Sequence, residues 1–344
     1  MKTALCAAAV LVAILPSMAW SQNTTNFARI GRVDRFDSSL DGLIAKDAVI
    51  EVLCGGFDWA EGPVWIPEKG NKFGGYVLFS DIPPNSVIKW QEGVGSSVFL
   101  KPSGYTGAAD YGREPGSNGL ALDAQGRLVS CEHGDRRISV LTAGGGKVTL
   151  ADRWQGKRFN SPNDLAIRDN GDIFFTDPIY GLPRREKDPM REIDFCGVYR
   201  LQKDGTVTLQ SKEISRPNGI AFSPDHKTLY VANSDGRDAV WRAFRLKGYG
   251  SLGAPRGFFD SSKQEDISRG GGDGLKVDAK GNVFATGPGG VLVISPKGKL
   301  LGRIVTGERI ANVGWGNDGS VLYLTSDMYL CRIKTLTRGA GFNR

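Results

Sequence analysis

Polar and apolar positions follow the same short pattern six times along the chain. Each copy opens with a polar residue, continues through a small or polar residue into a short apolar run, passes a turn with Asp, Asn or Gly, and ends in a β-rich run. Six copies spaced roughly 40 to 57 residues apart are typical of a propeller with about four strands per blade. The pattern therefore predicts an all-β fold, a six-bladed β-propeller. Its copies begin at Glu61, Asn118, Asn163, Asn218, Asp273 and Asn312.

Three segments outside the repeated pattern have predicted places in the ring. Residues 48–53 (AVIEVL) form a strand-like run, and we expect it to complete the last blade by pairing with residues 322–325 or 330–334. Residues 102–117 are rich in Gly, Pro and Tyr, and residues 183–195 are charged. We expect these two insertions to overhang one face of the ring and to shape the mouth of a pocket.

Composition supports the all-β prediction and narrows the range of partners. The 47 glycines and the many DG, NG and GG pairs mark turns, while helical periodicity is nearly absent. The formal net charge of +7 comes from scattered basic residues without the aromatic interleaving of nucleic-acid-binding proteins, so no nucleic-acid partner is expected. The basic surface is interpreted as solvated, with mild attraction for sugar acids or anionic polymers as the alternative.

The first 21 residues have the features of a secretory signal peptide. Lys2 precedes an apolar run over residues 4–14, and Ala19-Trp20-Ser21 resembles a cleavage site. We therefore expect residues 22–344 to form a single propeller domain that is exported to the periplasm or secreted. This apolar run over residues 4–14 is too short to span a membrane, and the sequence has no other long apolar stretch. The sequence leaves the oligomeric state open.

Four cysteines follow the predicted cleavage site: Cys54, Cys131, Cys196 and Cys331. An exported protein permits disulfides, and four cysteines allow three pairings between which the sequence does not choose. Free buried thiols are the alternative, because Cys131 and Cys196 lie in β-type runs. None of the four has the spacing of a metal site.

The first residue of each copy of the pattern points to a metal site. Equivalent positions in equivalent blades lie at similar depth, so six oxygen-bearing side chains are expected to face one central channel. Two are carboxylates, Glu61 and Asp273, and the other four are amides. Such a set suits a hard cation such as Ca²⁺ or Mg²⁺ rather than a thiophilic metal. Turn chemistry explains any single Asn here, but it does not explain Glu61.

Several motifs together resemble the SMP-30/gluconolactonase/luciferin-regenerating family. They are EGPVW, SPNDL with IFFTDPIYGL, RPNGIAFSPDHKTLYVANS and GGDGLKVDAKGNVFATG. The resemblance implies a six-bladed propeller that holds a divalent metal on its axis and hydrolyses lactones, with relatives that hydrolyse phosphotriesters. It implies four metal ligands: Glu61, Asn163, Asn218 and Asp273. Ca²⁺ is favoured, and Zn²⁺, Mn²⁺ or Mg²⁺ are possible.

Five other residues are candidates for the substrate pocket: Asn118, His133, Asp177, Tyr180 and Asn312. Asn118 and Asn312 share the column of first residues, and His133 is one of only two histidines. A structural role is the alternative for each, and for Asp177 it is a turn with Pro178. Ser161 stands where some animal members of the family carry a substrate-binding Arg, so sugar recognition need not follow theirs.

The function expected from these residues is metal-dependent hydrolysis of a small, sugar-type lactone. The metal would polarise the carbonyl, and Asp273 is the candidate base that takes a proton from the attacking water. One alternative is hydrolysis of organophosphates or other esters at the same metal. Another is a non-enzymatic propeller that binds a ligand and holds a structural metal. A Ser-His-Asp triad is not expected, because no G-x-S-x-G motif is present.

Overall fold

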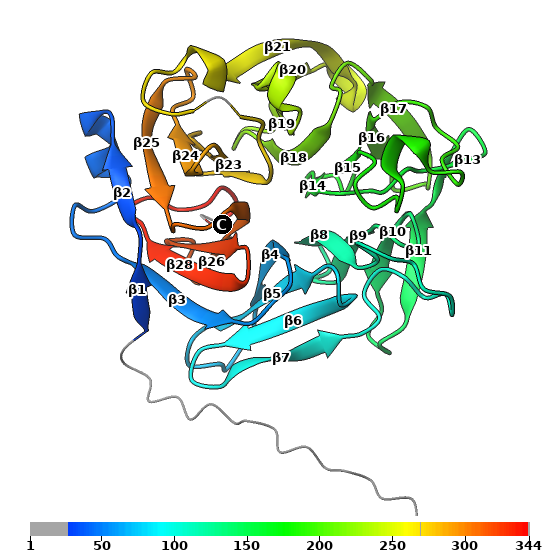
Figure 1. Cartoon of the computed structure of the whole chain (residues 1–344), viewed down its shortest axis with the longest axis horizontal. Coiled ribbons are helices and arrows are strands. Elements are labelled where there is room, and N and C mark those ends of the chain that lie inside the picture. Colours follow the sequence, from blue (N-terminus) through cyan, green and yellow to red (C-terminus); the bar gives the residue numbers. More distant parts are fainter. Residues whose placement is uncertain (1–26, 269, 343–344) are drawn as a thin grey trace, which may run out of the picture.

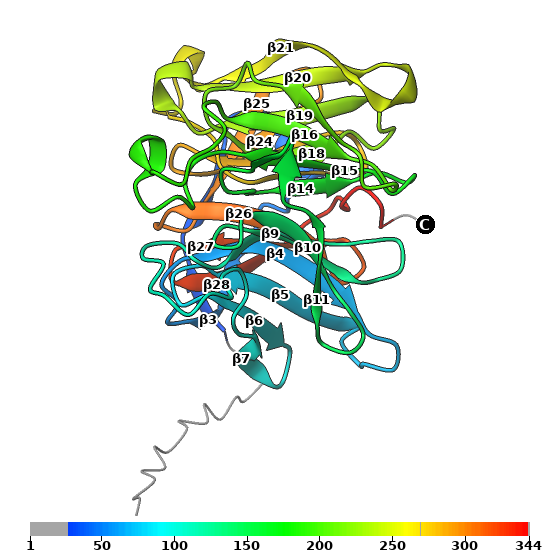
Figure 2. The same cartoon turned by 90° about the vertical axis from the view of Figure 1, so that its right-hand side faces the viewer.

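The protein is described by a computed structural model that covers residues 27–268 and 270–342. Six antiparallel sheets of four or five strands stand around a central axis (Figure 1), and a separate two-stranded ribbon joins the second and third sheets. Figure 2 shows the same ring edge-on, with connecting loops on both of its sides. The predicted six-bladed β-propeller is therefore confirmed.

Each blade is named by its place in the ring, and its first strand is the innermost one. Blades one and two consist of β4 (Ala60–Pro67), β5 (Gly75–Asp81), β6 (Ser86–Gln91), β7 (Gly95–Leu100), β8 (Ser117–Leu122), β9 (Leu128–Glu132), β10 (Arg137–Leu141) and β11 (Lys147–Ala151). The ribbon is β12 (Arg153–Trp154) and β13 (Lys157–Arg158). Blades three and four consist of β14 (Leu165–Ile167), β15 (Ile173–Asp177), β16 (Gly197–Leu201), β17 (Val207–Ser211), β18 (Pro217–Phe222), β19 (Thr228–Asn233), β20 (Val240–Leu246) and β21 (Leu252–Asp260).

Blades five and six combine strands from both ends of the chain. Blade five is β22 (Leu275–Val277), β23 (Val283–Gly287), β24 (Gly290–Ile294), β25 (Leu300–Val305) and, at its outer edge, β2 (Arg32–Arg35). Blade six is β26 (Ile310–Gly316), β27 (Val321–Ser326), β28 (Tyr329–Lys334), β3 (Ile50–Gly55) and β1 (Ala28–Ile30). Within the described residues, the helical elements are five short 3₁₀ turns: η1 (Ser38–Gly42), η2 (Arg185–Lys187), η3 (Gly236–Asp238), η4 (Gly248–Gly250) and η5 (Ser261–Lys263).

The turn that ends the innermost strand is set by an Asp side chain of the repeated pattern. Asp123 Oδ1 accepts hydrogen bonds from the backbone nitrogens of Gln125 and Arg127, both at 2.9 Å. Asp278 Oδ1 does the same for the second and fourth residues after it. A short acceptor side chain that binds its own backbone two residues on stabilises a tight reversal. The Asp-x-x-Gly letters of the pattern therefore join the first two strands of a blade.

The ring closes through pairing between distant parts of the chain. β3 lies beside β28, with Ile50 opposite Ile333, and the Arg332 guanidinium reaches Glu51 at 2.7 Å. This confirms the predicted closing role of residues 48–53 and selects the second of the two expected partners. A second strand from the N-terminal part of the chain, β2, pairs with β25 of blade five.

Apolar side chains fill the space between neighbouring blades. The cluster between blades six and one includes Trp65 and Tyr323, whose rings stack with centroids 6.0 Å apart. Corresponding clusters occupy the other five interfaces. Burial of these side chains, at roughly 25 cal/mol per Å², presses each blade against the next and leaves the axis to polar groups.

Three further predictions concern the cysteines, membrane-spanning segments and the signal peptide. All four cysteines after the expected cleavage site are free thiols. In the part of the chain that the structure describes, no helix has the length and apolar character needed to cross a bilayer. The predicted signal peptide, residues 1–21, lies outside the described residues.

Candidate functional site

The six first residues of the repeated pattern gather at the same end of the innermost strands. Glu61, Asn118, Asn218 and Asn312 lie at or near the start of β4, β8, β18 and β26. Asn163 and Asp273 precede β14 and β22 by two residues. All six side chains are buried, with at most 9% of any residue exposed. The column predicted from the sequence therefore exists.

Close packing around the axis explains why glycine follows most of these residues. A Cβ on Gly219 would lie 2.3 Å from the carbonyl oxygen of Asp273, and a Cβ on Gly274 would lie 2.0 Å from the Asn312 side chain. Such distances leave no room for a side chain. Hydroxyls of the second strands hold the same backbone, because Ser80 Oγ donates to the Asn118 carbonyl and Thr176 Oγ1 to the Asn218 carbonyl, both at 2.8 Å.

Blade three departs from this rule, since Asp164 follows Asn163. Asp164 Oδ1 accepts from the backbone nitrogen of Leu165 at 2.9 Å. Its Oδ2 accepts from Asn312 Nδ2 at 3.4 Å and lies 3.7 Å from Lys276 Nζ. These partners belong to blades six and five, so the carboxylate of Asp164 must lie near the axis.

Glu61 and Asp273 are two further buried carboxylates of the channel, and their hydrogen-bond partners differ from those of Asp164. Glu61 accepts hydrogen bonds from the backbone of Gly62, at 3.0 Å, and from the Asn312 side chain. Burial raises the pKa of Glu61 well above its ordinary value, and the negative charge of Asp273 raises it further. Asp273 accepts from Asn218 and, at 3.2 Å, from Arg309.

The surroundings of Asp273 bring the pKa of its carboxyl close to neutral pH. Burial raises its pKa to about 6, the neighbouring Asp164 contributes to the rise, and Arg309 opposes it. Buried carboxylates whose pKa values are raised by burial and by neighbouring negative charge create a demand for positive charge.

The donor set of the channel fits a hard divalent cation. Two carboxylates supply charge, and amide oxygens supply neutral ligands of the kind Ca²⁺ accepts. The Oδ1 atom of Asn118 is buried and has no hydrogen-bond partner among the described residues. No three His, Cys, Asp or Glu side chains of residues 27–268 and 270–342 form a group that could hold a metal by themselves. A metal here would therefore depend on the asparagines.

Asn163 and Asn218, the two predicted amide ligands, are held by their backbones. Asn163 N donates to the Thr176 carbonyl at 2.9 Å, and the Asn163 carbonyl accepts from Gly119 N at 2.7 Å. Asn218 is tied to Asp273 by its side chain. The structure thus brings Glu61, Asn218 and Asp273 into one network, with Asn163 beside it.

His133 lies next to this network and is buried completely. Its Nε2 is 3.3 Å from Asn118 Nδ2, and its Nδ1 is 3.6 Å from Glu114 Oε2. Burial lowers the pKa of His133 to about 4, so the imidazole is neutral at pH 7. A neutral ring in this place orients Asn118 rather than carrying charge.

Asp177 and Tyr180 have different surroundings. Both oxygens of Asp177 accept backbone hydrogen bonds at 2.8 Å, from Asn160 and Ser161, so the carboxylate holds its own blade in shape. Burial raises the pKa of Asp177 to about 7. Tyr180 reaches across to blade four, where its hydroxyl is 2.5 Å from Ser234 Oγ. Asp177 therefore supports the loop before Asn163, and Tyr180 lies at the mouth.

A cleft of about 680 Å³ opens onto Asp273 at this end of the channel. Its walls are largely glycine, and Ser234 and Arg309 line it as well. Of the first predicted insertion, Tyr111 donates its hydroxyl to the Gly181 carbonyl, just before the second insertion, at 2.8 Å. The residues that line this cleft come from neither insertion, so their role at a pocket mouth stays a prediction.

The opposite end of the innermost strands carries a different hollow. Its volume is about 530 Å³, and apolar side chains such as Ile167, Phe222 and Trp315 line it. Lys276, which contacts Asp164, is the charged group on its inner side. This hollow offers no pair of buried carboxylates and little for a polar ligand.

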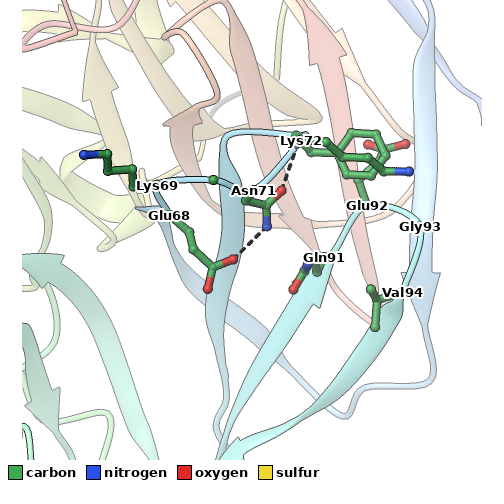
Figure 3. Close-up of a pocket in the computed structure, with 10 residues that line it drawn as sticks. Glu68, Lys69, Asn71, Lys72, Gln91, Glu92, Gly93 and Val94 are labelled. Carbon is green, nitrogen blue, oxygen red and sulfur yellow. Dashed lines mark hydrogen bonds between the residues drawn. The ribbon is translucent and has the colours of Figure 1, made fainter.

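A third hollow, of about 510 Å³, lies on blade one beyond the end of β4 (Figure 3). Asn71 donates a hydrogen bond to Glu68 at 2.8 Å there, and Lys69 and Lys72 surround it. These are exposed turn residues at the end of β4 that lies away from Glu61. Their side chains are already solvated, so this hollow is not a candidate site.

Sequence reasoning missed four charged residues of the site. Asp164 carried a usable signal, because the third copy reads ND where a glycine is sterically required in most others. Lys276 lies on an innermost strand, but the repeated pattern gave it no special place. Glu114 and Arg309 lie in loops that the pattern does not reach.

Comparison with known proteins identifies relatives of this chain. The family model described as "SMP-30/Gluconolactonase/LRE-like region" matches residues 59–328. The gluconolactonase of Zymomonas mobilis is 36% identical over 327 residues, which cover 93% of this chain and 90% of that protein. A solved gluconolactonase from Xanthomonas campestris has a TM-score of 0.77 at 30% identity, covering 91% of this chain and 99% of its own. A calcium-binding regucalcin from Agrobacterium tumefaciens, at 19% identity and a TM-score of 0.64, covers 84% of this chain and 94% of its own and shares the fold.

Proposed function

Because the chain belongs to the SMP-30/gluconolactonase/LRE-like family, we propose that it opens a sugar-type lactone with a divalent metal ion bound in its central channel. The observation that carries the metal part of this proposal is the buried pair Glu61 and Asp273, in which burial and the charge of Asp273 raise the pKa of Glu61 and burial raises that of Asp273. Ca²⁺ is the favoured ion, because the set of carboxylate and amide oxygens contains no nitrogen or sulfur ligand.

Four residues of the column would hold the ion: Glu61, Asn163, Asn218 and Asp273. When bound, such an ion supplies a Lewis acid that polarises the lactone carbonyl and stabilises negative charge on its oxygen. Glu61 lies deeper than Asp273, which lines the cleft. Glu61 therefore serves the ion alone, whereas Asp273 also faces the space that a substrate would occupy.

We assign the role of general base to Asp273. Its carboxylate lines the cleft, so it can reach a water placed beside a substrate there. The oxygen of water attacks the carbonyl carbon, its proton passes to Asp273, and the ring C–O bond breaks. The departing ring oxygen takes up a proton, so the product is a hydroxy acid.

His133 and Asn118 would position the substrate rather than exchange protons with it. His133 is neutral at pH 7 and packs against Asn118, whose Oδ1 has no hydrogen-bond partner in the described chain. A free acceptor facing a polar channel is suited to a sugar hydroxyl. Tyr180 and Ser234 add hydroxyl groups at the mouth.

Turnover of D-glucono-δ-lactone after chelation tests the proposal. We expect the stripped protein to lose its activity above the spontaneous rate and to regain it with Ca²⁺, Mn²⁺ or Zn²⁺. Glu68→Gln, in the hollow of blade one, is the matched carboxylate control and keeps the parent rate. Full activity of the stripped protein in excess chelator would exclude the central metal.

We also propose export, for which the support is the sequence of residues 1–21 alone. Mass spectrometry of the protein purified from its natural source is expected to find a mature N-terminus near Gln22. An intact Met1 on protein recovered from the cytosol would contradict export.

A further inference from the structure

The mouth of the cleft carries arginine side chains that the lactonase chemistry itself does not use. Arg309 lies in the loop between β25 and β26, and its guanidinium sits 5.0 Å from the centroid of the Trp59 ring. It donates one hydrogen bond, to Asp273, while 65% of its side chain stays exposed. A guanidinium has five N–H groups in a planar fork, so most of this donor capacity faces the cleft.

Arg185, from the second insertion, lies behind the Tyr180 ring, one residue away from the cleft wall, and has three unusual features. Its backbone φ is +50°, a left-handed conformation that is uncommon for residues other than glycine. Its guanidinium lies 5.8 Å from the ring of Tyr180, which in turn contacts Ser234 of the cleft wall. Its Nε is buried and has no hydrogen-bond partner within the described part of the chain. A strained backbone that holds an unpaired donor at a pocket is a sign of a binding role.

Electrostatics place these arginines around one point. Burial raises the pKa of the Glu114 carboxyl, and the positive charges that oppose the rise come from Arg113, Arg185 and Arg309. Glu114 lies beside His133, and the charge of Asp273 also reaches it. The charges of three arginines therefore act on Glu114, and one of the three, Arg309, also contacts Asp273 at 3.2 Å. A divalent ion that neutralises Asp273 would leave this region with a clear excess of positive charge.

We propose that Arg309 and Arg185 form an anion subsite that selects a lactone carrying a second acidic group, such as a terminal carboxylate. This inference rests on the proposed lactonase function and specifies its substrate class. The planar fork of arginine matches the two oxygens of a carboxylate or of a phosphate, which a lysine does not. The cleft of about 680 Å³ has room for a six-carbon sugar acid beside Asp273.

Metal binding and substrate binding are linked through Arg309. Its guanidinium donates a hydrogen bond to Asp273 at 3.2 Å. An ion held by Glu61, Asn163, Asn218 and Asp273 would satisfy that carboxylate and leave the guanidinium for the acidic group of the substrate. The guanidinium of Arg309 would then pass from the carboxylate of Asp273 to that of the substrate, while a cation–π contact with the Trp59 ring holds it in place.

The test compares two lactones that differ at one end. D-glucono-1,4-lactone ends in a hydroxymethyl group, and D-glucaro-1,4-lactone, with the same ring, ends in a carboxylate. We expect kcat/KM to be at least about tenfold higher for the acidic lactone, the scale of a charge-assisted hydrogen bond. Arg309→Gln and Arg185→Gln are each expected to reduce this ratio toward one, and Arg309→Lys to keep part of it. A gluconolactone phosphorylated at the same end forms a second arm that separates carboxylate from phosphate recognition.

Arg338→Gln is the matched control. Arg338 contacts Asp318 at 3.2 Å and is 53% exposed, so it resembles Arg309 in everything but its distance from the cleft. In Arg338→Gln, the ratio of kcat/KM for the acidic lactone to that for the neutral lactone is expected to equal the ratio of the parent protein. Hydrolysis of the neutral lactone with a ratio near one in the parent protein, or a ratio that Arg309→Gln and Arg185→Gln leave unchanged, would overturn the anion subsite while the lactonase function stands.

Equilibrium binding separates this inference from the function on which it rests. Calorimetric titration with D-glucarate and D-gluconate, at equal free Ca²⁺, needs no turnover. Tighter binding of glucarate by about tenfold or more, lost in Arg309→Gln, supports the subsite even if the parent protein hydrolyses neither lactone. Equal binding of the two anions by the parent protein would refute it.

Discussion

The two carboxylate networks of the central channel meet the cost of buried charge in opposite ways. Asp164 is surrounded by donors, because Lys276, Asn312 and the backbone of Leu165 all approach its oxygens. Glu61 instead lies within reach of the negative charge of Asp273, and Arg309, the cation that contacts this pair among the described residues, is largely exposed. The first network is complete within the chain, whereas the second is short of positive charge.

This difference shows which part of the channel is structural and which is functional. A buried charge without sufficient compensation costs stability, so a chain that retains one does so where a ligand can supply the missing charge. The hollows at the two ends of the channel show the same difference between a polar and an apolar surrounding. Glycine and arginine line the one beside Asp273, and apolar side chains line the one beside Lys276. The expected effects of mutations at the two networks therefore differ in kind.

Loss of Asp273 tests the functional network most severely. Asp273→Ala removes a metal ligand and the proposed base, so kcat/KM for lactone is expected to fall at least about 10³-fold. Asn218→Ala removes a neutral ligand only, and excess metal is expected to restore part of its rate. His133→Ala is expected to keep measurable activity. Parent rates for both Glu61→Ala and Asp273→Ala in the presence of chelator would show that the two networks do not differ in function.

Stability measurements sharpen the contrast from the other side. Asp164→Ala leaves Lys276 without its carboxylate, and we expect the free energy of unfolding to fall by about 2–3 kcal/mol, less than for a fully buried pair because 26% of the Lys276 side chain is exposed. In the metal-free protein, Glu61→Gln removes a repelling charge and is expected to raise the free energy of unfolding. Denaturant titration in chelator measures both. A loss of stability in Glu61→Gln as large as that in Asp164→Ala would make the two networks equivalent.

The smallest expected effect is on the pH dependence of stability without metal. The raised pKa of Asp273, about 6 against an ordinary value of 3.8, means that the folded protein binds more protons than the unfolded chain between these values. The free energy of unfolding therefore decreases as pH rises from about 4 to about 6, by an amount on the order of 1 kcal/mol. Saturating Ca²⁺ is expected to reverse the trend. An unchanged pH dependence in Asp273→Asn would assign it to another group.

The fold and the column of six side chains could be predicted because the chain repeats them. Spacing encodes the blades, and the first letter of each copy falls at the same depth in every blade. Residues 48–53 were predictable as the closing run because they form a strand without a partner of their own. These signals depend only on which residue stands at which position along the chain, and a single sequence contains that information.

The charges that complete the site could not be predicted in this way. Arg309 and Arg185 reach the mouth from loops whose course depends on the packed ring, and their neighbours come from distant segments. Asp164 reaches the axis only because its backbone packs against blade two and its side chain extends toward blades five and six. Contacts of this kind follow from closure of the ring, and no local pattern records them.

Closure of the ring also dictates the order in which the chain can fold. Glu51 meets Arg332, a residue 281 positions later, so blade six cannot be finished until synthesis has passed β28. Blades one to four contain contiguous strands and can assemble while the chain is still growing. Until the last strand is made, the apolar cluster around Leu53 and Leu330 stays open to solvent. A ribosome that stalls near the end of the message would therefore release a nearly complete ring with one unpaired, aggregation-prone edge.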